Sequence, residues 1–506
     1  MNITFDKSIG NAKIAELDKL ERERIAEIRN TPNTVSHSHS GAVYYVSPNG
    51  NDALNGRTPK SAVRTISRAI GVSKQGDAIL LERGGCWREK IVVPEDRTIS
   101  AYGEGRKPII SGSPEDGSGA EKWTLDYADE SGKKIWRFYN DALTDVGAIF
   151  FDGDGNFNYK GFARKQIPNV RFGKYTCREN PEREYDYREE LENMTLFHKW
   201  NTHTDCEIIP ADSAVGSVFL RCDKGNPGEL FRNIEFNTRG HNITVRGNNV
   251  TIDNLCIVHT GGHGIGAGTV ENLTVTNCEV GWIGGSLQNY RRDEYGSFIR
   301  YGNGVQVFGG CKGYTIENCY VYQCYDAGIT HQYSKKSKGD CFMNDVLYKN
   351  NVITDCVYCI EYFLTEIEDY KRGGENILFE GNLLRRAGFG FGSTRHNTGG
   401  DGCIRSGGTS NNPFKNFVIK NNILDRSTTF LVQCTIKSEE YTPKMIGNTY
   451  IQGVGNRLCH FGVELEKVDV DENTESYVKN LLSDEEADVY CVDFVPKYVY
   501  EIYEGQ

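Results

Sequence analysis

"YTIENCYVYQC" (residues 314–324) contains two short alternating apolar runs separated by a polar pair, and this pattern recurs along the second half of the chain. The other copies are VTIDNLCIVHT (250–260), LTVTNCEVGWI (273–283), VLYKNNVITDC (346–356), ILFEGNLLRRA (377–387), FVIKNNILDRS (417–427) and KMIGNTYIQGV (444–454). The residue at the shared position is Leu255, Cys278, Cys319, Asn351, Asn382, Asn422 and Asn448, with spacings of 23, 41, 32, 31, 40 and 26 residues. This spacing predicts coils of about two dozen residues with insertions of variable length.

One such coil cannot bury its own apolar side, so the copies are expected to stack into a solenoid of parallel sheets. Asparagine suits a sharp bend between two sheets, because it tolerates left-handed backbone angles and its side chain can bond to the next coil. The alternative is an antiparallel sandwich with Asn-Gly turns. The scarcity of strands joined by a two-residue turn argues against it.

The stretch YYVSPNGNDALNGRTPKSAVRTISRAI (44–70) and the strands after it resemble the N-terminal entry of right-handed parallel β-helix proteins of the pectate-lyase-like superfamily. The resemblance implies a strand, a loop and a helix that caps the apolar end of the solenoid. It covers residues 43–112 and the coils after 242. It implies a fold more strongly than an activity, because one fold hosts many activities.

Four segments are expected, in an all-β protein with a short N-terminal helical part. Residues 1–42 contain a helix with Leu17, Leu20, Ile25 and Ile28 facing the solenoid, followed by a polar linker. Residues 43–112 form the cap and first coils, and residues 242–506 form the main coils and the C-terminal cap. Residues 113–241 depart from the repeat and are expected to form an inserted antiparallel, sandwich-like unit, as in several β-helix glycoside hydrolases that the chain resembles.

The composition of the chain limits the kinds of partner that it is expected to bind. A formal charge of −11 over 506 residues, with no cluster of Lys and Arg, argues against nucleic acid. The polar N-terminus and the lack of a long apolar window argue against export and a membrane span, so we expect a cytoplasmic protein. The 16 cysteines are then expected to be reduced. Cys356 and Cys359 form an isolated CxxC pair, and we expect neither metal nor cofactor. An outer sheet face without loops would favour a homo-oligomer.

The substrate of a packed solenoid must lie on an outer face between loops. The longest insertions, within 278–319 and 382–422, follow the second strand of their coils and are expected to wall a groove. Its floor would consist of the segments NGVQVFGG (303–310), DAGITHQYS (326–334), CIEYFLTE (359–366) and GFGSTRH (390–396), stacked about 4.8 Å apart.

Glu361 is the principal catalytic candidate. Its apolar neighbours would raise the pKa of its carboxyl, so that it holds a proton at neutral pH. Asp326 lies one coil earlier, near the separation of about 5.5 Å for a retaining pair or about 6.5–9.5 Å for an inverting pair. The alternative interpretations are that Glu361 is an ordinary exposed residue of the sheet and that Asp326 caps a turn. Asp401 is the reserve carboxylate.

Several neighbours are candidate substrate-binding residues: the polar His331, Gln332, Arg395 and His396, and the aromatic Tyr362 and Trp282, whose rings suit the apolar faces of sugars. His263, in GGHGIGAG, resembles part of the polygalacturonase motif. The other parts of that motif are missing, so we expect this residue to be structural or peripheral.

The leading hypothesis is a glycoside hydrolase that acts on terminal sugars of oligosaccharides. It is similar to the intracellular β-xylosidase type of β-helix enzyme. A polysaccharide lyase or uronate epimerase is the first alternative. It would need a base and often Ca²⁺, for which Asp293, Glu294, Glu366, Glu368 and Asp369 are scattered candidates. A non-catalytic carbohydrate-binding solenoid is the second.

Overall fold

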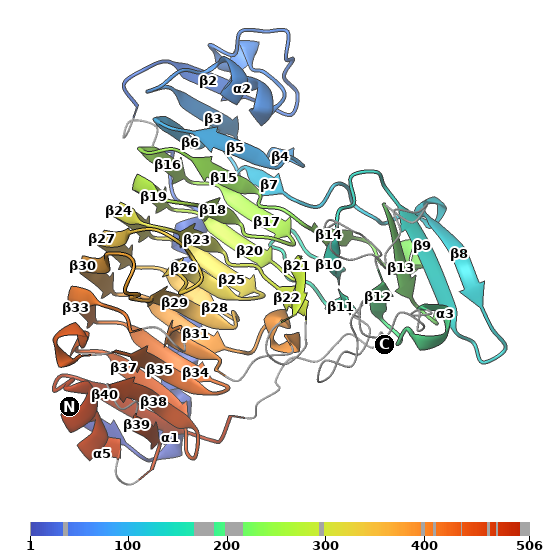
Figure 1. Cartoon of the computed structure of the whole chain (residues 1–506). Helices are drawn as coiled ribbons and strands as arrows, with labels where there is room; N and C mark the ends of the chain where they lie inside the picture. The colour runs from blue at the N-terminus through green and yellow to red at the C-terminus, as the bar shows by residue number, and fades with distance from the viewer. Residues whose placement is uncertain are drawn as a thin grey trace.

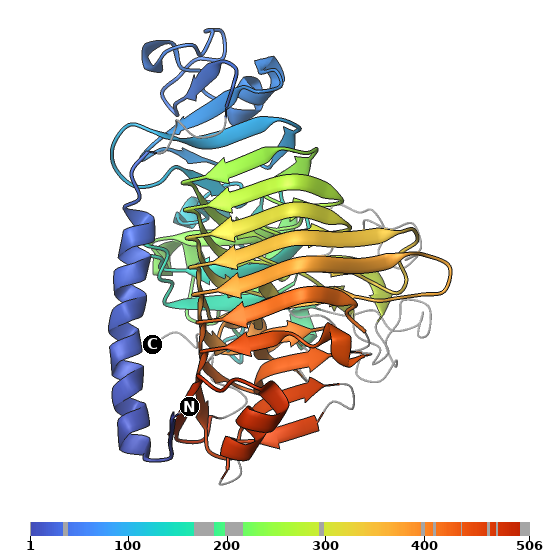
Figure 2. The same ribbon diagram turned by 90° about the vertical axis from the view of Figure 1, so that its left-hand side faces the viewer.

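The computed structural model describes residues 2–33, 39–165, 187–197, 216–292, 298–395, 400–407, 411–436, 438–462, 466–471 and 474–495. Its main body is a stack of coils in which three parallel sheets run the length of the molecule (Figures 1 and 2). Each central coil gives one strand to each sheet in turn, as do β24 (Cys311–Glu317), β25 (Tyr320–Cys324) and β26 (Ala327–Tyr333). The expected parallel β-helix is confirmed.

Apart from β1, which pairs with β40, the strands enter each sheet in chain order. The first sheet contains β2 (Val43–Val46), β3 (Ala78–Glu82), β6 (Arg97–Tyr102), β16 (Val250–Asp253), β19 (Val270–Thr276), β24, β27 (Cys341–Lys349), β30 (Arg372–Glu380), β33 (Phe414–Lys420) and β36 (Lys444–Ile446). The second contains β4 (Cys86–Trp87), β7 (Ile109–Ser111), β17 (Cys256–Thr260), β20 (Glu279–Ile283), β25, β28 (Val352–Thr354), β31 (Leu383–Ala387), β34 (Ile423–Ser427), β37 (Thr449–Gly453), β40 (Asp488–Val492) and β1 (Asn2–Thr4). The third contains β5 (Ile91–Pro94), β15 (Ile243–Arg246), β18 (Ile265–Ala267), β23 (Val305–Phe308), β26, β29 (Tyr358–Leu364), β32 (Gly402–Ser406), β35 (Phe430–Thr435), β38 (Arg457–Gly462) and the antiparallel β39 (Glu466–Asp469).

The turn between the first and second sheets contains the asparagine ladder that the repeat predicted. Asn351 Nδ2 donates to Asn382 Oδ1 at 2.9 Å, Asn382 Nδ2 to Asn422 Oδ1 at 2.9 Å, and Asn422 Nδ2 to Asn448 Oδ1 at 3.1 Å. Asp484 ends the ladder by accepting from Asn448 Nδ2. All four asparagines are fully buried, so each bond satisfies polar groups that water cannot reach.

The left-handed bend itself is made by the preceding residue. Asn318, Asn350 and Asn421 have φ of 53°, 53° and 54°, and Gly381 and Gly447 occupy the same position with φ of 67° and 61°. Asparagine and glycine are the residues that adopt this region at least cost. The expected ladder is therefore confirmed, but bending and laddering are divided between two adjacent positions.

Short helices complete the ends of the stack. Helix α2 (Ile66–Val72), near the top of Figure 1, buries Ile66 and Ala69 in the main core beside Val46. Thr65 caps it by accepting a hydrogen bond from the Arg68 N–H. This is the cap that the N-terminal resemblance implied. At the other end lies α5 (Thr474–Tyr477).

The N-terminal helix α1 (Lys7–Arg29) runs alongside the stack against the second sheet (Figure 2). Leu17 and Ile28 are buried in a cluster with residues of β28, β31, β37 and β40. Arg385 of β31, with no exposed side-chain surface, pairs with Asp18 at 2.8 Å and Glu21 at 2.5 Å. The predicted packing helix is confirmed.

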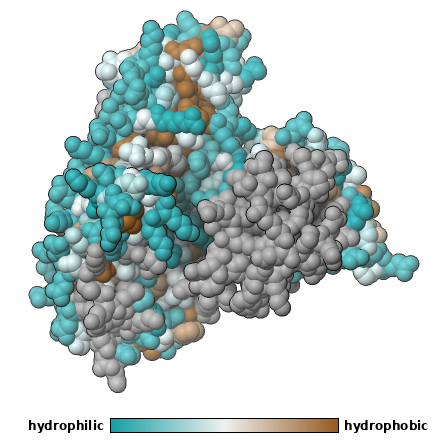
Figure 3. Space-filling view, viewed as in Figure 1, coloured by the Kyte–Doolittle hydropathy of each residue, from teal (hydrophilic) through white to brown (hydrophobic). Residues whose placement is uncertain are grey.

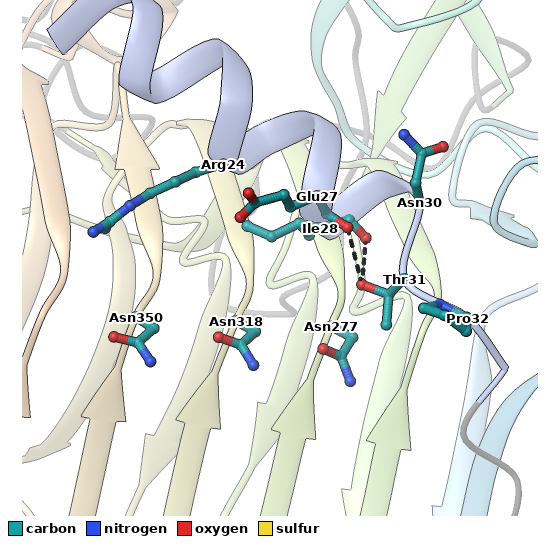
Figure 4. Close-up of a pocket in the computed structure, with 9 residues that line it drawn as sticks. All are labelled: Arg24, Glu27, Ile28, Asn30, Thr31, Pro32, Asn277, Asn318 and Asn350. Atoms are coloured by element: carbon teal, nitrogen blue, oxygen red, sulfur yellow. Dashed lines mark hydrogen bonds between the residues drawn. The ribbon is translucent and has the colours of Figure 1, made fainter.

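A cavity of about 560 Å³ lies between the C-terminal end of α1 and the turns that follow the first sheet (Figure 4). Its lining comprises Arg24, Glu27, Ile28, Asn30, Thr31, Pro32, Asn277, Asn318 and Asn350. The asparagines form a row along successive coils, at the corner of the solenoid opposite the third sheet. The cavity is therefore separate from the groove expected on the third sheet.

The inserted unit begins after β7 and lies beside the stack in Figure 1. It contains β8 (Trp123–Ala128), β9 (Lys134–Tyr139), β10 (Val146–Phe151), β11 (Gly161–Lys165), β12 (Thr195–Phe197), β13 (Ser217–Arg221), β14 (Ile234–Thr238), α3 (Tyr187–Glu190) and α4 (Pro227–Leu230). Its described strands form one continuous sheet joined to the solenoid where Thr238 pairs with Thr260. Phe138 of β9 stacks on Phe236 of β14 with ring centroids 4.6 Å apart. The unit is therefore one sheet that curls on itself, so that residues of distant strands pack together in its interior.

Candidate functional site

The third sheet places Glu361 on its outer face. In strand β29, Ile360 and Tyr362 lie in the solenoid core, so Glu361 between them points outward. The pairing of neighbouring strands puts Thr330, Glu361 and Arg405 in one outer column, one residue per coil. This face of the molecule is largely hydrophilic over the described part of the solenoid (Figure 3).

Glu361 is only 6% exposed, although it lies on an outer face. Gln332 Nε2 donates to its Oε2 at 2.9 Å, and Arg405 Nη1 donates to its Oε1 at 3.1 Å. Burial raises the pKa of Glu361 from 4.5 to about 7, against the opposing charge of Arg405 and with the help of Asp326. The carboxyl group therefore exchanges a proton near neutral pH, as a general acid requires.

Asp326 supplies the second carboxylate from the turn between β25 and β26. Arg395, which follows a short 3₁₀ helix (Phe391–Thr394), donates a hydrogen bond from Nη1 to Asp326 Oδ1. The carboxylate of Asp326 is close enough to Glu361 to raise the pKa of the latter. Each carboxylate is paired with a different arginine, and the Asp326 carbonyl accepts a hydrogen bond from the N–H of Tyr358, three residues before Glu361 in β29.

An aromatic ring joins the two pairs. The Arg405 guanidinium lies over the ring of Tyr358, 4.2 Å from its centroid. Burial raises the pKa of Tyr358 to about 12, against the opposing charges of Arg405 and Arg395. The side chain is therefore a neutral phenol at physiological pH. It fixes the guanidinium that holds Glu361.

Replacing Arg405 by Leu is expected to move the pKa of Glu361 above 7, because the arginine charge now favours the ionised carboxylate. The measurement is a pH titration of the ¹³C-labelled Glu361 carboxyl by NMR. Arg405→Lys, which keeps the charge, is the control and should shift the midpoint less. An unchanged or lower midpoint in Arg405→Leu would show that Arg405 does not act on this carboxyl.

Of the other predicted residues, the structure brings Gln332 and Arg395 into the site. His331 and Tyr362 are not there, and their expected position on the groove is wrong. Their rings stack inside the solenoid with centroids 6.0 Å apart, and both side chains are at most 1% exposed. His331 Nδ1 lies 2.8 Å from the Tyr348 hydroxyl, and burial lowers the pKa of His331 to about 3.

Trp282 is also displaced from the expected position. It belongs to β20 of the second sheet, where its ring packs 4.7 Å from that of Phe150 in the inserted unit. Its Nε1 donates to the Phe157 carbonyl. Its role is to dock the insertion on the solenoid, and it does not reach the third sheet.

Asp401 lies in the turn directly before β32 of the third sheet and is 1% exposed. Its Oδ2 accepts a hydrogen bond from Thr428 Oγ1 at 2.7 Å, which holds it against the following coil. His396 lies outside the described residues, as do Asp293 and Glu294.

Arg405 is not among the site residues that the sequence predicts, because the floor strand of its coil is expected at 390–396. That segment contains the 3₁₀ turn, and the strand is β32. A usable signal existed: Cys403-Ile404-Arg405 repeats Cys359-Ile360-Glu361, and the structure pairs these strands in this register.

No helix in the described ranges is long and apolar enough to cross a membrane. Among the same residues, no group of three or more His, Cys, Asp or Glu side chains is placed to hold a metal ion.

Comparisons with known proteins give distant likenesses. No family model matches the sequence, and no curated protein matches it. Among solved structures, XylC in complex with xylose aligns at TM-score 0.37 and 15% identity, over 89% of this chain and 82% of that one. An alginate lyase from Paenibacillus sp. str. FPU-7 aligns at 0.36 and 11%, over 89% and 99%. The GH136 lacto-N-biosidase from Eubacterium ramulus aligns at 0.32 and 12%, over 90% and 68%. At these TM-scores the likenesses carry no argument about activity, and both hydrolases and lyases are among them.

Proposed function

We propose that the protein is a carbohydrate-active enzyme, and specifically a glycoside hydrolase that cleaves oligosaccharides lying along the third sheet. The observation that carries the proposal is Glu361, a nearly buried carboxyl on an outer sheet face with a pKa of about 7. A purely structural outer-face glutamate would gain nothing from this environment, because burial disfavours its charged form.

In the proposed mechanism Glu361 is the general acid. It transfers its proton to the glycosidic oxygen as the bond to the anomeric carbon breaks. Asp326, held by Arg395, takes the complementary role, as nucleophile in a retaining reaction or as the base that activates water in an inverting one. Gln332 and Arg405 orient the Glu361 carboxyl through its two oxygens.

A lyase is the second candidate, and the arginines favour it. Arg395 and Arg405 stay charged at all relevant pH values, and a guanidinium binds a carboxylate in two places at once. A uronate carboxylate could compete for either arginine. β-Elimination would then need a base instead of an acid.

One assay separates the candidates. Wild-type protein is incubated with a panel of aryl glycosides and with uronate-containing polymers, while released aglycone and the ultraviolet absorbance of unsaturated uronate are recorded together. Aglycone release that is lost in Asp326→Asn supports the hydrolase. Unsaturated products would transfer the proposal to the lyase, and no turnover of any substrate would overturn both.

A further inference from the structure

A second polar cluster lies on the third sheet above the carboxylate pair. His241 and His263, from adjacent coils, stack with ring centroids 4.6 Å apart and an interplanar angle of 24°. Tyr301 meets His263 edge-on at 5.0 Å. From the sequence His263 is expected to be structural or peripheral, and His241 is not singled out.

Hydrogen bonds define the tautomer of both imidazoles. His241 Nδ1 accepts from the His263 backbone N–H at 3.0 Å, and His263 Nδ1 accepts from the Asn303 backbone N–H at 2.9 Å. Burial lowers the pKa of both rings, that of His241 to about 4. A neutral ring whose Nδ1 accepts carries its proton on Nε2. Each ring therefore carries its N–H on Nε2.

The ring of His241 lies on the same outer sheet face as Glu361. His241 Cδ2 and Nε2 lie over Gly266, where a Cβ on the glycine would come within 3.1 and 3.4 Å of them. Gly266 occupies the outer column that continues through Gln306 and Thr330 to Glu361. Three strand spacings separate Gly266 from Glu361, or roughly 14 Å. An oligosaccharide extended along the column would reach from one to the other.

The charges around His241 are cationic. Lys90 and Arg239 are the charged groups that act on its titration. Lys90 Nζ donates to the carbonyls of Thr238 and Arg239, and Arg239 donates to those of Leu287 and Gln288. Burial lowers the pKa of Lys90 to about 7, so Arg239 supplies the permanent positive charge. Neutral N–H donors beside that charge favour an anion. The net charge of the whole chain is −11, whereas the charged groups beside His241 are basic.

We propose that His241 and His263 form a distal subsite that binds the carboxylate of a uronic acid residue, several sugar units from the bond cleaved at Glu361. The proposal rests on the proposed function for its place along an oligosaccharide. The binding itself does not require turnover. It makes the natural substrate an acidic or mixed oligosaccharide.

The test compares binding of sodium glucuronate and glucose by calorimetry, with ¹⁵N-histidine NMR to identify the ring that responds. His241→Asn is the informative variant, because its Oδ1 can replace Nδ1 as acceptor for the His263 N–H while the Nε2–H is lost. His460→Asn, in the same outer column at the far end of the sheet, is the matched control. We expect wild-type protein and the control to prefer glucuronate at least tenfold, and His241→Asn to lose that preference with its fold intact by circular dichroism.

Equal affinity for the two sugars, no binding of either, or an unchanged preference in His241→Asn would overturn the subsite. The same calorimetry is carried out on Glu361→Gln, so that binding at the subsite is measured apart from the proposed catalysis. Uronate preference without any turnover in wild-type protein would leave the subsite standing and sink the enzyme. Turnover of a substrate without any preference for glucuronate would support the enzyme and overturn the subsite.

Discussion

Glu361→Gln protein is expected to retain no more than about one thousandth of the wild-type rate of glycoside release, because the substitution removes the proton donor and its charge together. The amide can still accept from Arg405 and occupies the same volume, so the fold should persist. The measurement is kcat on the best aryl glycoside of the panel. Glu375→Gln, at an exposed strand position of the first sheet, is the matched control. A loss below about tenfold would remove Glu361 from the chemistry.

The raised pKa of Glu361 also predicts how kcat and the free energy of unfolding depend on pH. The proposed mechanism uses the acid form of Glu361, so wild-type kcat should fall as pH rises through about 7. Glu361 binds its proton more tightly in the folded state, where its pKa is about 7, than in the unfolded state, where its pKa is 4.5. Wild-type unfolding free energy should therefore decrease relative to Glu361→Gln as pH rises from 4.5 to 7, and stay lower above that. At 1.36 kcal/mol per pKa unit the difference is at most about 3 kcal/mol. Parallel stability curves for the two proteins would contradict the raised pKa.

Asn422→Ala is expected to lower the free energy of unfolding by about 3–5 kcal/mol, because several buried polar groups lose their partners at once. The Asn382 N–H and Nδ2 both donate to Asn422 Oδ1, and Asn422 Nδ2 donates to the carbonyl of Phe379. Denaturant titration measures the loss.

Asn421→Gly provides the control for the ladder. Asn421 is the exposed neighbour that makes the left-handed bend, and glycine adopts the same angles freely, so its stability should change by about 0.5 kcal/mol or less. Equal losses in the two variants would show that the turn conformation, and not the buried ladder, is what the asparagines provide.

Sequence reasoning reached the stacked coils because periodicity and turn chemistry are local properties. It placed Glu361 correctly on an outer face for the same reason. It failed where alternation was not applied strictly: His331 and Gln332 are adjacent in one strand, so only one of them can face outward, and the structure turns Gln332 out. The Glu361–Arg405 contact depends on which segment of a long, glycine-rich insertion forms the strand, and local propensity does not decide that.

The histidine pair could not be expected from the sequence either. His241 precedes the first recognisable copy of the repeat, and its ring fills space left by a glycine on the next coil. Only the strand register brings these positions together.

The position of α1 has a consequence for how the chain assembles. Asn2 of β1 bonds to Asp488 of β40, 486 residues further along, and the apolar face of α1 rests on strands from β28 to β40. This N-terminal segment therefore finds its binding surface only after the C-terminal coils have formed. Such a long closure is slow and adds contacts that a folding nucleus lacks. Helix α1 therefore docks late in folding. It should have little effect on the folding rate of the solenoid and should mainly lower the unfolding rate of its C-terminal coils.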